Sequence, residues 1–353
     1  MTQDTLPDLI ETPAAWLGRS MAETPAHWRT VLTQEQIAEL EAATRHFLAT
    51  NQELTQLTAA KFPLTEMAEL LASKKQQLLH GAGFELLSGL PVERYTTKFA
   101  ATLFYGVGAH LGSARSQNAD GHILGQVRDT GADAANPDTR IYQTAERQSF
   151  HTDSADVVGL LCLQQAKEGG DSLLVSAVSI FNRMREECPA LAAELFRPVA
   201  TDRRGEVPPG AAPYMNIPVL SWYQQQLTVF YQRQYIESAQ RFDDIPPLTT
   251  DYIAALDRFD ALANDPDMHL VMRLKPGDMQ FVYNHSQLHD RTGFVDWPEP
   301  PRRRHLFRLW LSMAGDRELP PCFAERYGSL DVGDRGGIVT SGTQLSVPPE
   351  LRD

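Results

Sequence analysis

The first part of the chain carries apolar residues at the three- and four-residue spacing of amphipathic helices. In the run LTQEQIAELEAATRHFL, Thr33 is a suitable N-cap, because its hydroxyl can accept a hydrogen bond from a backbone N–H of the first turn. A second helical run follows and stops at Gly81 and Gly83. We therefore expect residues 1–80 to form a helical layer.

The pattern then changes from helical to strand-like. A strand is expected at FELLSGLPV, and a longer amphipathic helix from Tyr95 to Leu111. From about Gly121 onward, short apolar runs are separated by Gly, Pro, Asn and Asp, which is typical of strands joined by turns. These runs are HILGQVRD, RIYQ, DVVGLLCLQQ, DSLLVS, MQFVYN and RRRHLFRLWLSM.

Two helical segments interrupt the strands, at about 178–196 and 250–264. The sequence shows no internal repeat, and we interpret VPPGAAP as a surface loop. The pattern therefore predicts a mainly β fold with surrounding helices. Residues 81–353 are expected to form one domain, with residues 1–80 as an N-terminal helical extension packed on it.

Composition narrows the range of partners. Hydrophobic residues make up 42% of the 353 residues and charged residues 22%, as in ordinary globular proteins. The net charge of -13 disfavours binding to nucleic acid or to an anionic membrane, because both would be repelled. A small-molecule partner is therefore expected, and a homo-oligomer stays open.

Three cysteines, Cys162, Cys188 and Cys322, give an odd total with no close pair, so neither a disulfide framework nor a cysteine zinc site is indicated. The first residues, MTQDTLPDLIETP, are acidic where a signal peptide would be basic, and no apolar run has the length of a membrane span. We predict a cytoplasmic protein.

Candidate metal ligands occur in two places. His151 and Asp153 flank Thr152 at the start of a strand-like run, where alternation would put both side chains on one face. A surface hydrogen-bonded pair is the alternative. NHSQLHDRTGF offers His289 as a third ligand, with His285 as its rival because a strand would place both on one face. Two imidazoles and one carboxylate leave three coordination positions, which suits iron(II) that also binds an oxo-acid and dioxygen.

An anion site is indicated by the last strand-like run. Alternation in RHLFRLWL places Arg304, Leu306, Arg308 and Trp310 on one face. A buried guanidinium requires an anionic partner, and arginine binds carboxylates through two parallel hydrogen bonds. Arg304 and Arg308 are therefore candidates for binding a carboxylate, with a structural ion pair as the alternative.

Four segments, in this order, resemble the taurine and 2,4-dichlorophenoxyacetate dioxygenase-like family, which includes clavaminate synthase and γ-butyrobetaine hydroxylase. They are HTD at 151–153, GGDS at 169–172, LHDRTGF at 288–294 and RHLFR at 304–308. The resemblance covers roughly residues 80–315. Asp290, where glycine is common, and the N-terminal helical region depart from it.

The resemblance implies a double-stranded β-helix, or jelly roll, with Fe(II) held by His151, Asp153 and His289. It further implies that 2-oxoglutarate binds Ser172 and Arg304, while Arg308 assists or faces the primary substrate. Such enzymes use O2 and convert 2-oxoglutarate to succinate and CO2. Hydroxylation is the expected outcome, because halogenating relatives lack the carboxylate that Asp153 supplies.

The substrate is expected to be a small polar metabolite, such as an amino-acid derivative or another carboxylate. Candidate contacts combine polarity with a position before HTD or in the run WYQQQLTVFYQRQY, although each could be an exposed sheet residue; they are Gln117, Asn118, Tyr142, Gln143 and Arg233. Two other classes stay open. A jelly-roll hydrolase or isomerase could use the triad with zinc or manganese but would not need Arg304 or Ser172, and a non-catalytic binding protein would not need the metal.

Overall fold

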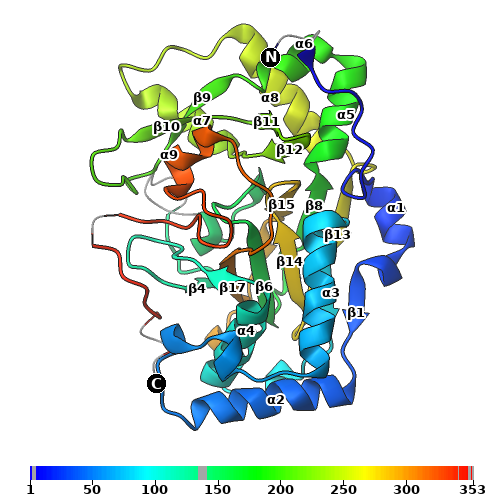
Figure 1. Ribbon diagram of the computed structural model, residues 1–353, viewed down its shortest axis with the longest axis vertical. Helices are drawn as coiled ribbons and strands as arrows, with labels where there is room; N and C mark the ends of the chain where they lie inside the picture. The colour runs from blue at the N-terminus through cyan, green and yellow to red at the C-terminus, as the bar shows by residue number, and fades with distance from the viewer. Residues whose placement is uncertain (2–4, 134–140, 341, 349–350, 352–353) are drawn as a thin grey trace.

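Two β-sheets face each other at the centre of the molecule (Figure 1). The computed structural model describes residues 1, 5–133, 141–340, 342–348 and 351. The larger sheet has the order β1-β2-β14-β6-β17-β3, with β4 also pairing to β17. Its strands are β1 (Arg29–Val31), β2 (Phe84–Ser88), β3 (Ser113–Ala114), β4 (Leu124–Val127), β6 (Val157–Gln164), β14 (Met279–Tyr283) and β17 (His305–Ser312). β1 and β2 are parallel, and the other pairs are antiparallel.

The smaller sheet is antiparallel and has the order β13-β8-β15-β5. Its strands are β5 (Gln148–His151), β8 (Ser172–Ser176), β13 (His269–Met272) and β15 (Gln287–Arg291). Within the described residues, three two-stranded pairs complete the β structure; they are β7 (Glu168–Gly169) with β16 (Phe294–Val295), β9 (Pro198–Asp202) with β10 (Tyr214–Pro218), and β11 (Leu220–Tyr223) with β12 (Gln226–Val229). This arrangement agrees with the predicted mainly β jelly roll.

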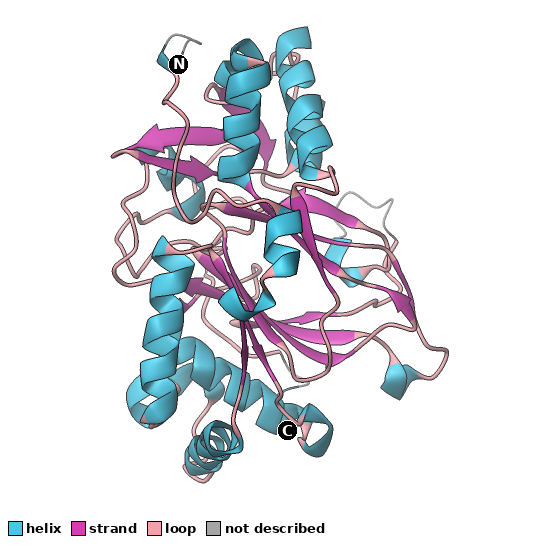
Figure 2. Cartoon of the chain, turned by 90° about the vertical axis from the view of Figure 1, so that its right-hand side faces the viewer, coloured by secondary structure: helices cyan, strands magenta, loops and turns pink. Residues whose placement is uncertain are grey.

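Helices cover the outer faces of both sheets, as Figures 1 and 2 show. The helices are α1 (Gly18–Glu23), α2 (Gln34–Leu48), α3 (Glu66–His80), α4 (Thr97–Leu111), α5 (Ala177–Glu187), α6 (Pro189–Glu194), α7 (Arg233–Ser238), α8 (Thr250–Ala263) and α9 (Ala324–Tyr327). One buried cluster joins α2, α3 and α4 to the larger sheet, and a second joins α5, α6 and α8 to the smaller one. A third fills the space between the sheets. No helix of the described residues is long and apolar enough to cross a membrane.

Alternation in β17 explains how one strand serves two layers. Leu306 and Trp310 belong to the cluster between the sheets, whereas Phe307 and Leu309 belong to the cluster that includes α4. Arg308 has the same parity as Leu306, so its side chain faces the interior between the sheets. The predicted division of this strand into two faces is confirmed.

Two expectations about local structure were wrong. Ile141–Gln143 of the run RIYQ forms a 3-10 helix rather than a strand, closed by the hydrogen bond from Thr144 N–H to the Ile141 carbonyl; Arg140 lies outside the described residues. The run WYQQQLTVFYQRQY contains β11 and β12 but ends in α7, so Arg233 begins a helix instead of lying in a strand.

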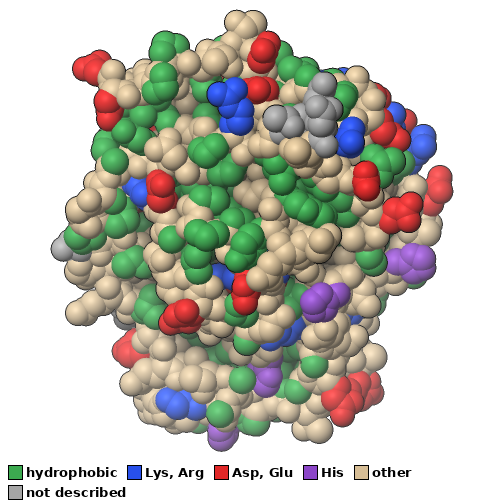
Figure 3. All heavy atoms as spheres, turned by 45° about the horizontal axis from the view of Figure 1, so that its top comes forward, with side chains coloured by type: hydrophobic (Ala, Val, Ile, Leu, Met, Phe, Trp, Pro, Cys, Tyr) green, Lys and Arg blue, Asp and Glu red, His purple; other side chains and the backbone are tan. Residues whose placement is uncertain are grey.

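Charges of both signs are mixed on the molecular surface. On the face shown in Figure 3, Lys and Arg side chains are scattered among acidic and apolar ones. Some of the buried charged residues, among them Asp153, Arg291 and Arg308, lie where the candidate ligands meet.

Candidate metal centre and active site

The two candidate histidines face each other across neighbouring strands. His151 is the last residue of β5 and pairs in register with His289 of β15, with ring centroids 4.2 Å apart. Asp153 follows in the loop toward β6, and its carboxylate oxygens lie 3.9 Å from Nε2 of His151 and 3.8 Å from Nε2 of His289. HTD therefore ends a strand rather than starting one, and the loop after β5, not strand alternation, turns Asp153 toward His151.

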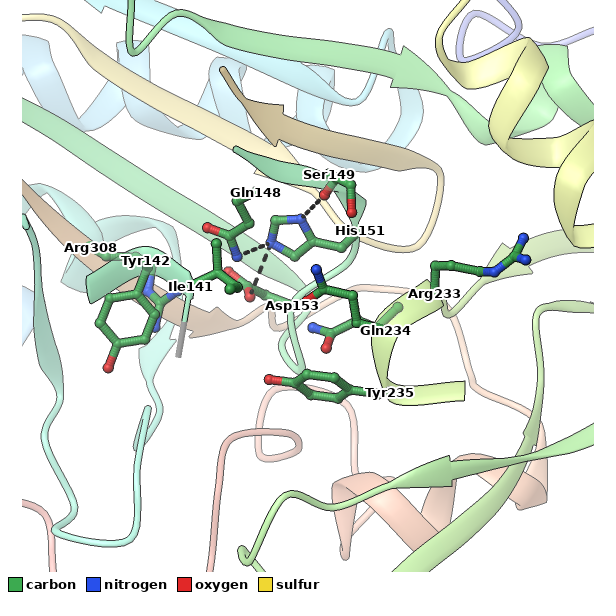
Figure 4. Close-up of a pocket in the computed structure, with 11 residues that line it drawn as sticks. Ile141, Tyr142, Gln148, Ser149, His151, Asp153, Arg233, Gln234, Tyr235 and Arg308 are labelled. Atoms are coloured by element: carbon green, nitrogen blue, oxygen red, sulfur yellow. Dashed lines mark hydrogen bonds and ion pairs between the residues drawn. The ribbon is translucent and has the colours of Figure 1, made fainter. Parts of the chain in front are cut away.

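Both imidazoles can offer a lone pair to a metal. Nδ1–H of His151 donates to the Ser149 carbonyl at 2.8 Å, which leaves Nε2 as the ligand atom (Figure 4). Nε2 of His289 is buried and has no hydrogen-bond partner among the described residues. Burial, followed by the charge of His151, lowers the pKa of His289 to about 3, so the ring is a neutral base. Ligand atoms of the three residues lie within 4.8 Å of one another, and this donor set fits a divalent metal.

The Asp153 carboxylate is held on its other side by the larger sheet. Nε1–H of Trp310 donates to Oδ2 at 2.8 Å, and a guanidinium nitrogen of Arg308 lies 3.7 Å from the same oxygen. Burial would raise the pKa of Asp153, but the charge of Arg308 and then those of the two histidines lower it. The carboxylate is therefore ionised, as a metal ligand must be.

A buried guanidinium without a full set of partners lies in the same cavity. Arg304 lines it together with Ser172, His289 and Asp153, and its NH1 atom has no hydrogen-bond partner among the described residues. Burial lowers the pKa of Arg304 to about 10, which still leaves the group charged at neutral pH. The Ser172 hydroxyl donates to Gln280 at 2.9 Å. An enclosed anion would satisfy Arg304.

Arg291 is a cavity residue that the sequence analysis missed. It lines the same cavity, its Nε is buried without a partner, and burial lowers its pKa to about 10. Its NH1 group donates to the Thr144 carbonyl at 2.9 Å and its NH2 group to the Glu146 carbonyl. Strand alternation from His289 could have identified it, since both residues belong to LHDRTGF.

Arg308 separates the Arg304 cavity from a second, adjoining one. Its Nε donates to Gln117 Oε1 at 2.8 Å, and the Tyr142 ring lies 4.6 Å from its guanidinium carbon. The Gln117 amide also donates to the Arg308 carbonyl at 2.8 Å. Gln117 therefore orients Arg308, whereas Tyr142 lines both cavities.

The second cavity opens beside the first turn of α7 (Figure 4). Gln234 and Tyr235 line it together with Gln148, whose amide donates to Nε2 of His151 at 2.9 Å. A metal bound at that nitrogen has to displace the amide. The sequence pattern identified none of these three residues. Gln234 and Tyr235 belong to a helix where a strand was expected, and Gln148 begins β5, the strand that ends at His151.

Of the remaining candidates, Arg233 lines the second cavity, whereas Asn118 and Gln143 lie elsewhere. The Arg233 side chain points away from the triad and forms ion pairs at 2.7, 2.9 and 3.2 Å with Glu237, Asp257 and Asp260. Asn118 bonds to His122 within its own turn. The Gln143 carbonyl accepts from Thr130, and neither Asn118 nor Gln143 lines either cavity.

The rival ligand His285 belongs to a different buried group. Its Nε2–H donates to Asp156 at 2.8 Å, and it does not share the cavity of His289. Strand alternation alone left both histidines as candidates for the third ligand. In the structure His289, and not His285, lies in the cavity with His151 and Asp153.

Comparison with known proteins identifies the family. A family model described as "Taurine catabolism dioxygenase TauD, TfdA family" matches residues 50–310. The chain belongs to this dioxygenase family. The resemblance drawn from the four segments is therefore confirmed, and the chain is an enzyme of the dioxygenase class.

Curated TauD/TfdA relatives cover most of the chain. An FR-33289 synthase of Streptomyces rubellomurinus is 35% identical over 309 residues, which are 86% of this chain and 90% of the relative. A taurine hydroxylase-like protein of Stachybotrys chartarum is 28% identical over 305 residues, covering 84% and 77%.

Solved structures share the TauD/TfdA fold at low identity. An asparagine oxygenase matches 90% of this chain and 99% of its own with a TM-score of 0.61 and 17% identity. The non-heme iron oxygenase OrfP, in complex with Fe and alpha-ketoglutaric acid, matches 80% and 93% with a TM-score of 0.62 and 15% identity.

Proposed function

We propose that the chain is an Fe(II)- and 2-oxoglutarate-dependent dioxygenase that hydroxylates a small anionic metabolite. One observation carries the proposal. The triad of His151, Asp153 and His289 shares a cavity with the buried, incompletely paired guanidinium of Arg304. A hydrolase would need the metal but not an enclosed cation, and a binding protein would need the cation but not the triad.

In this proposal the triad holds iron(II) and leaves positions for 2-oxoglutarate and dioxygen. When bound, the metal and its co-substrate supply the oxidising chemistry, with 2-oxoglutarate converted to succinate and CO2. The chain supplies orientation: Ser149 fixes the His151 ring, and Trp310 fixes one oxygen of Asp153.

The far carboxylate of 2-oxoglutarate is proposed to bind Arg304, with Ser172 donating a further hydrogen bond after releasing Gln280. Arg291 adds positive charge to the same end of the cavity. Apolar walls exclude water from these polar groups and so strengthen their interactions; they comprise Val127, Val158, Leu160, Leu274 and Leu306.

The primary substrate is proposed to enter beside α7 and to place its anionic group near Arg308, which faces both cavities. Gln148, Gln234 and Tyr235 offer hydrogen bonds to polar groups. An amino-acid derivative fits this chemistry, and solved structures of similar fold contain hydroxyasparagine or hydroxyarginine. Two relatives are named uridine-5'-phosphate dioxygenase, and the phosphate in that name is also an anionic group.

We further propose a cytoplasmic enzyme whose catalytic domain spans residues 81–353, with residues 1–80 as its extension. The free state of Cys162, Cys188 and Cys322 supports a reducing compartment. The packing of α2 and α3 in the cluster below the larger sheet supports an extension that is attached to the domain.

Anaerobic titration of the metal-free protein with Fe(II) and 2-oxoglutarate tests the function. A weak visible charge-transfer band is expected in the wild type, and His289→Ala should abolish it by removing a ligand. Arg304→Ala should require roughly 100-fold more 2-oxoglutarate, because it removes the charge-assisted pair. Folded wild-type protein without the band would overturn the proposal.

A further inference from the structure

A second buried charged cluster adjoins the loop that carries Asp153. It consists of Asp156, His285, Asp316 and Arg335, whose side chains are 0%, 1%, 2% and 0% exposed. None of these four residues lines either cavity of the site. Because buried charges are costly unless paired, a group of this size has to be held by specific contacts.

Arg335 joins the two carboxylates of this cluster. Its Nε donates to Asp156 at 2.8 Å and its NH2 group to Asp316 at 2.8 Å, while His285 donates to Asp156 at 2.8 Å. Burial would raise the pKa of Asp156, but the hydrogen bond and charge of His285 and the charge of Arg335 lower it. Two carboxylates and an imidazole at this spacing could hold a metal ion, and the guanidinium takes that place.

Asn284 connects the cluster to the metal-binding loop. It lies in the turn between β14 and β15, next to His285. The backbone N–H of Asp153 donates to its side-chain oxygen at 2.9 Å, and its amide donates to the Ala155 carbonyl at 2.9 Å. The turn that presents His285 to the cluster thus also holds the backbone of the proposed ligand Asp153.

The chain around Arg335 also packs directly on this loop. The Gly337 N–H donates to the Ser154 carbonyl at 2.7 Å, and Nε of Arg326 donates to the Ser154 hydroxyl at 2.6 Å. Gly336 has a φ of +77°, and a Cβ there would lie 2.9 Å from the Ser154 carbonyl oxygen. Residues 334–337, the sequence DRGG, therefore reach the loop at a distance that only glycine permits.

We propose that Arg335 and Asp156 are positioning residues, which clamp the C-terminal segment to the 153–156 loop and so fix the direction of the Asp153 carboxylate. The inference rests on the proposed function, because it takes Asp153 as a metal ligand. Arg335 acts at a distance: it contacts neither the ligands nor the cavities, and its effect passes through Asp156 and the loop backbone.

The test measures Fe(II) dissociation constants by anaerobic equilibrium dialysis, alongside thermal melting. Arg335→Ala and Asp156→Asn should each weaken Fe(II) binding by about 10- to 100-fold, the range found when the supports of metal ligands are removed. Millimolar guanidinium ion should restore much of the affinity of Arg335→Ala by refilling the site between the carboxylates, and Arg335→Lys should lose less than Arg335→Ala.

Glu85→Gln is the matched control. Glu85 is a carboxylate that is 2% exposed and paired with Lys74 at 3.0 Å, but it lies in β2, which contributes nothing to either cavity. This variant should melt at a lower temperature and keep the wild-type Fe(II) affinity.

Unchanged Fe(II) affinity in folded Asp156→Asn would overturn the inference and leave the cluster a purely structural feature. If Arg335→Ala does not fold, Asp156→Asn decides the outcome. Wild-type protein that binds no Fe(II) would overturn the proposed function, and this inference with it.

Discussion

At the scale of single residues, burial and neighbouring charges together determine the protonation states that the site can use. Burial lowers the pKa of His289 and keeps its ring neutral; burial would raise the pKa of Asp153, but the charge of Arg308 lowers it and the carboxylate is ionised. Arg304 keeps its charge despite burial. A neutral imidazole, an anionic carboxylate and a cationic guanidinium are together the states that binding a metal and an anion requires.

His305 provides a pH test away from the ligands. Burial, then the charge of Arg128, lowers its pKa to about 4, below the ordinary value of 6.5. Between these values the unfolded chain binds a proton that the folded protein excludes, so the free energy of unfolding falls as pH decreases through this window. His305→Phe should remove this pH-dependent loss of stability. Relative to the wild type, the free energy of unfolding of the variant should therefore gain up to about 3 kcal/mol between neutral pH and pH 4. Urea unfolding at several pH values measures it, and parallel curves for both proteins would contradict it.

At the scale of elements, local signals start helices and long-range pairs align strands. Thr33 forms a complete capping box with Gln36 at the start of α2. Asp290 accepts hydrogen bonds from Arg147 at 3.3, 3.0 and 2.5 Å. This pair ties β15 to the residue just before β5, and so supports the register that brings His151 and His289 together.

Thr33→Ala should lower the free energy of unfolding by about 1 kcal/mol, because a backbone N–H at the start of α2 loses its acceptor. Urea denaturation measures the change. Thr33→Ser keeps the hydroxyl and should stay close to the wild type. Equal losses in both variants would show that the cap contributes little.

Arg147→Ala should destabilise the protein more than Asp290→Asn does. The Asp290 side chain is fully buried while that of Arg147 is 47% exposed, so loss of the arginine strands a buried carboxylate. We expect about 2 kcal/mol for Arg147→Ala, less than for a fully buried pair because water screens the exposed partner. Chemical denaturation of the two variants tests the order, and the reverse order would refute it.

At the scale of the whole molecule, the candidate metal centre joins both sheets. His151 and His289 belong to the smaller sheet, whereas Asp153 is bonded to Trp310 of the larger one. A metal at this point would therefore link the two halves of the jelly roll in addition to the apolar cluster between them.

Fe(II) with 2-oxoglutarate should therefore raise the melting temperature. Ligands at about 100 times their dissociation constant stabilise a fold by about 2.7 kcal/mol, which corresponds to a shift of several degrees. Anaerobic thermal scanning measures the shift. His289→Ala should show almost none, and an equal shift in this variant would place the metal elsewhere.

The sequence by itself predicts those features that depend on short stretches of the chain. The capped helix α2, the two faces of β17 and the motifs that define the family all rest on neighbours a few residues apart. The candidate ligands and Arg304 could be named because recurring chemistry requires those residue types in that order. The fold of the family brings these residues together in space. They could therefore be identified without knowledge of how this chain packs.

Only the tertiary structure decided which polar residues face the site. Arg233 lines the second cavity, but three acidic partners hold its guanidinium, whereas Gln234 and Tyr235 reach the same cavity from a helix that the strand-like pattern had hidden. Arg335 meets Asp156 across 179 positions of sequence. The contact between Arg335 and Asp156 depends on the free energy of pairing buried charges, and that energy exists only after the whole chain has excluded water from them.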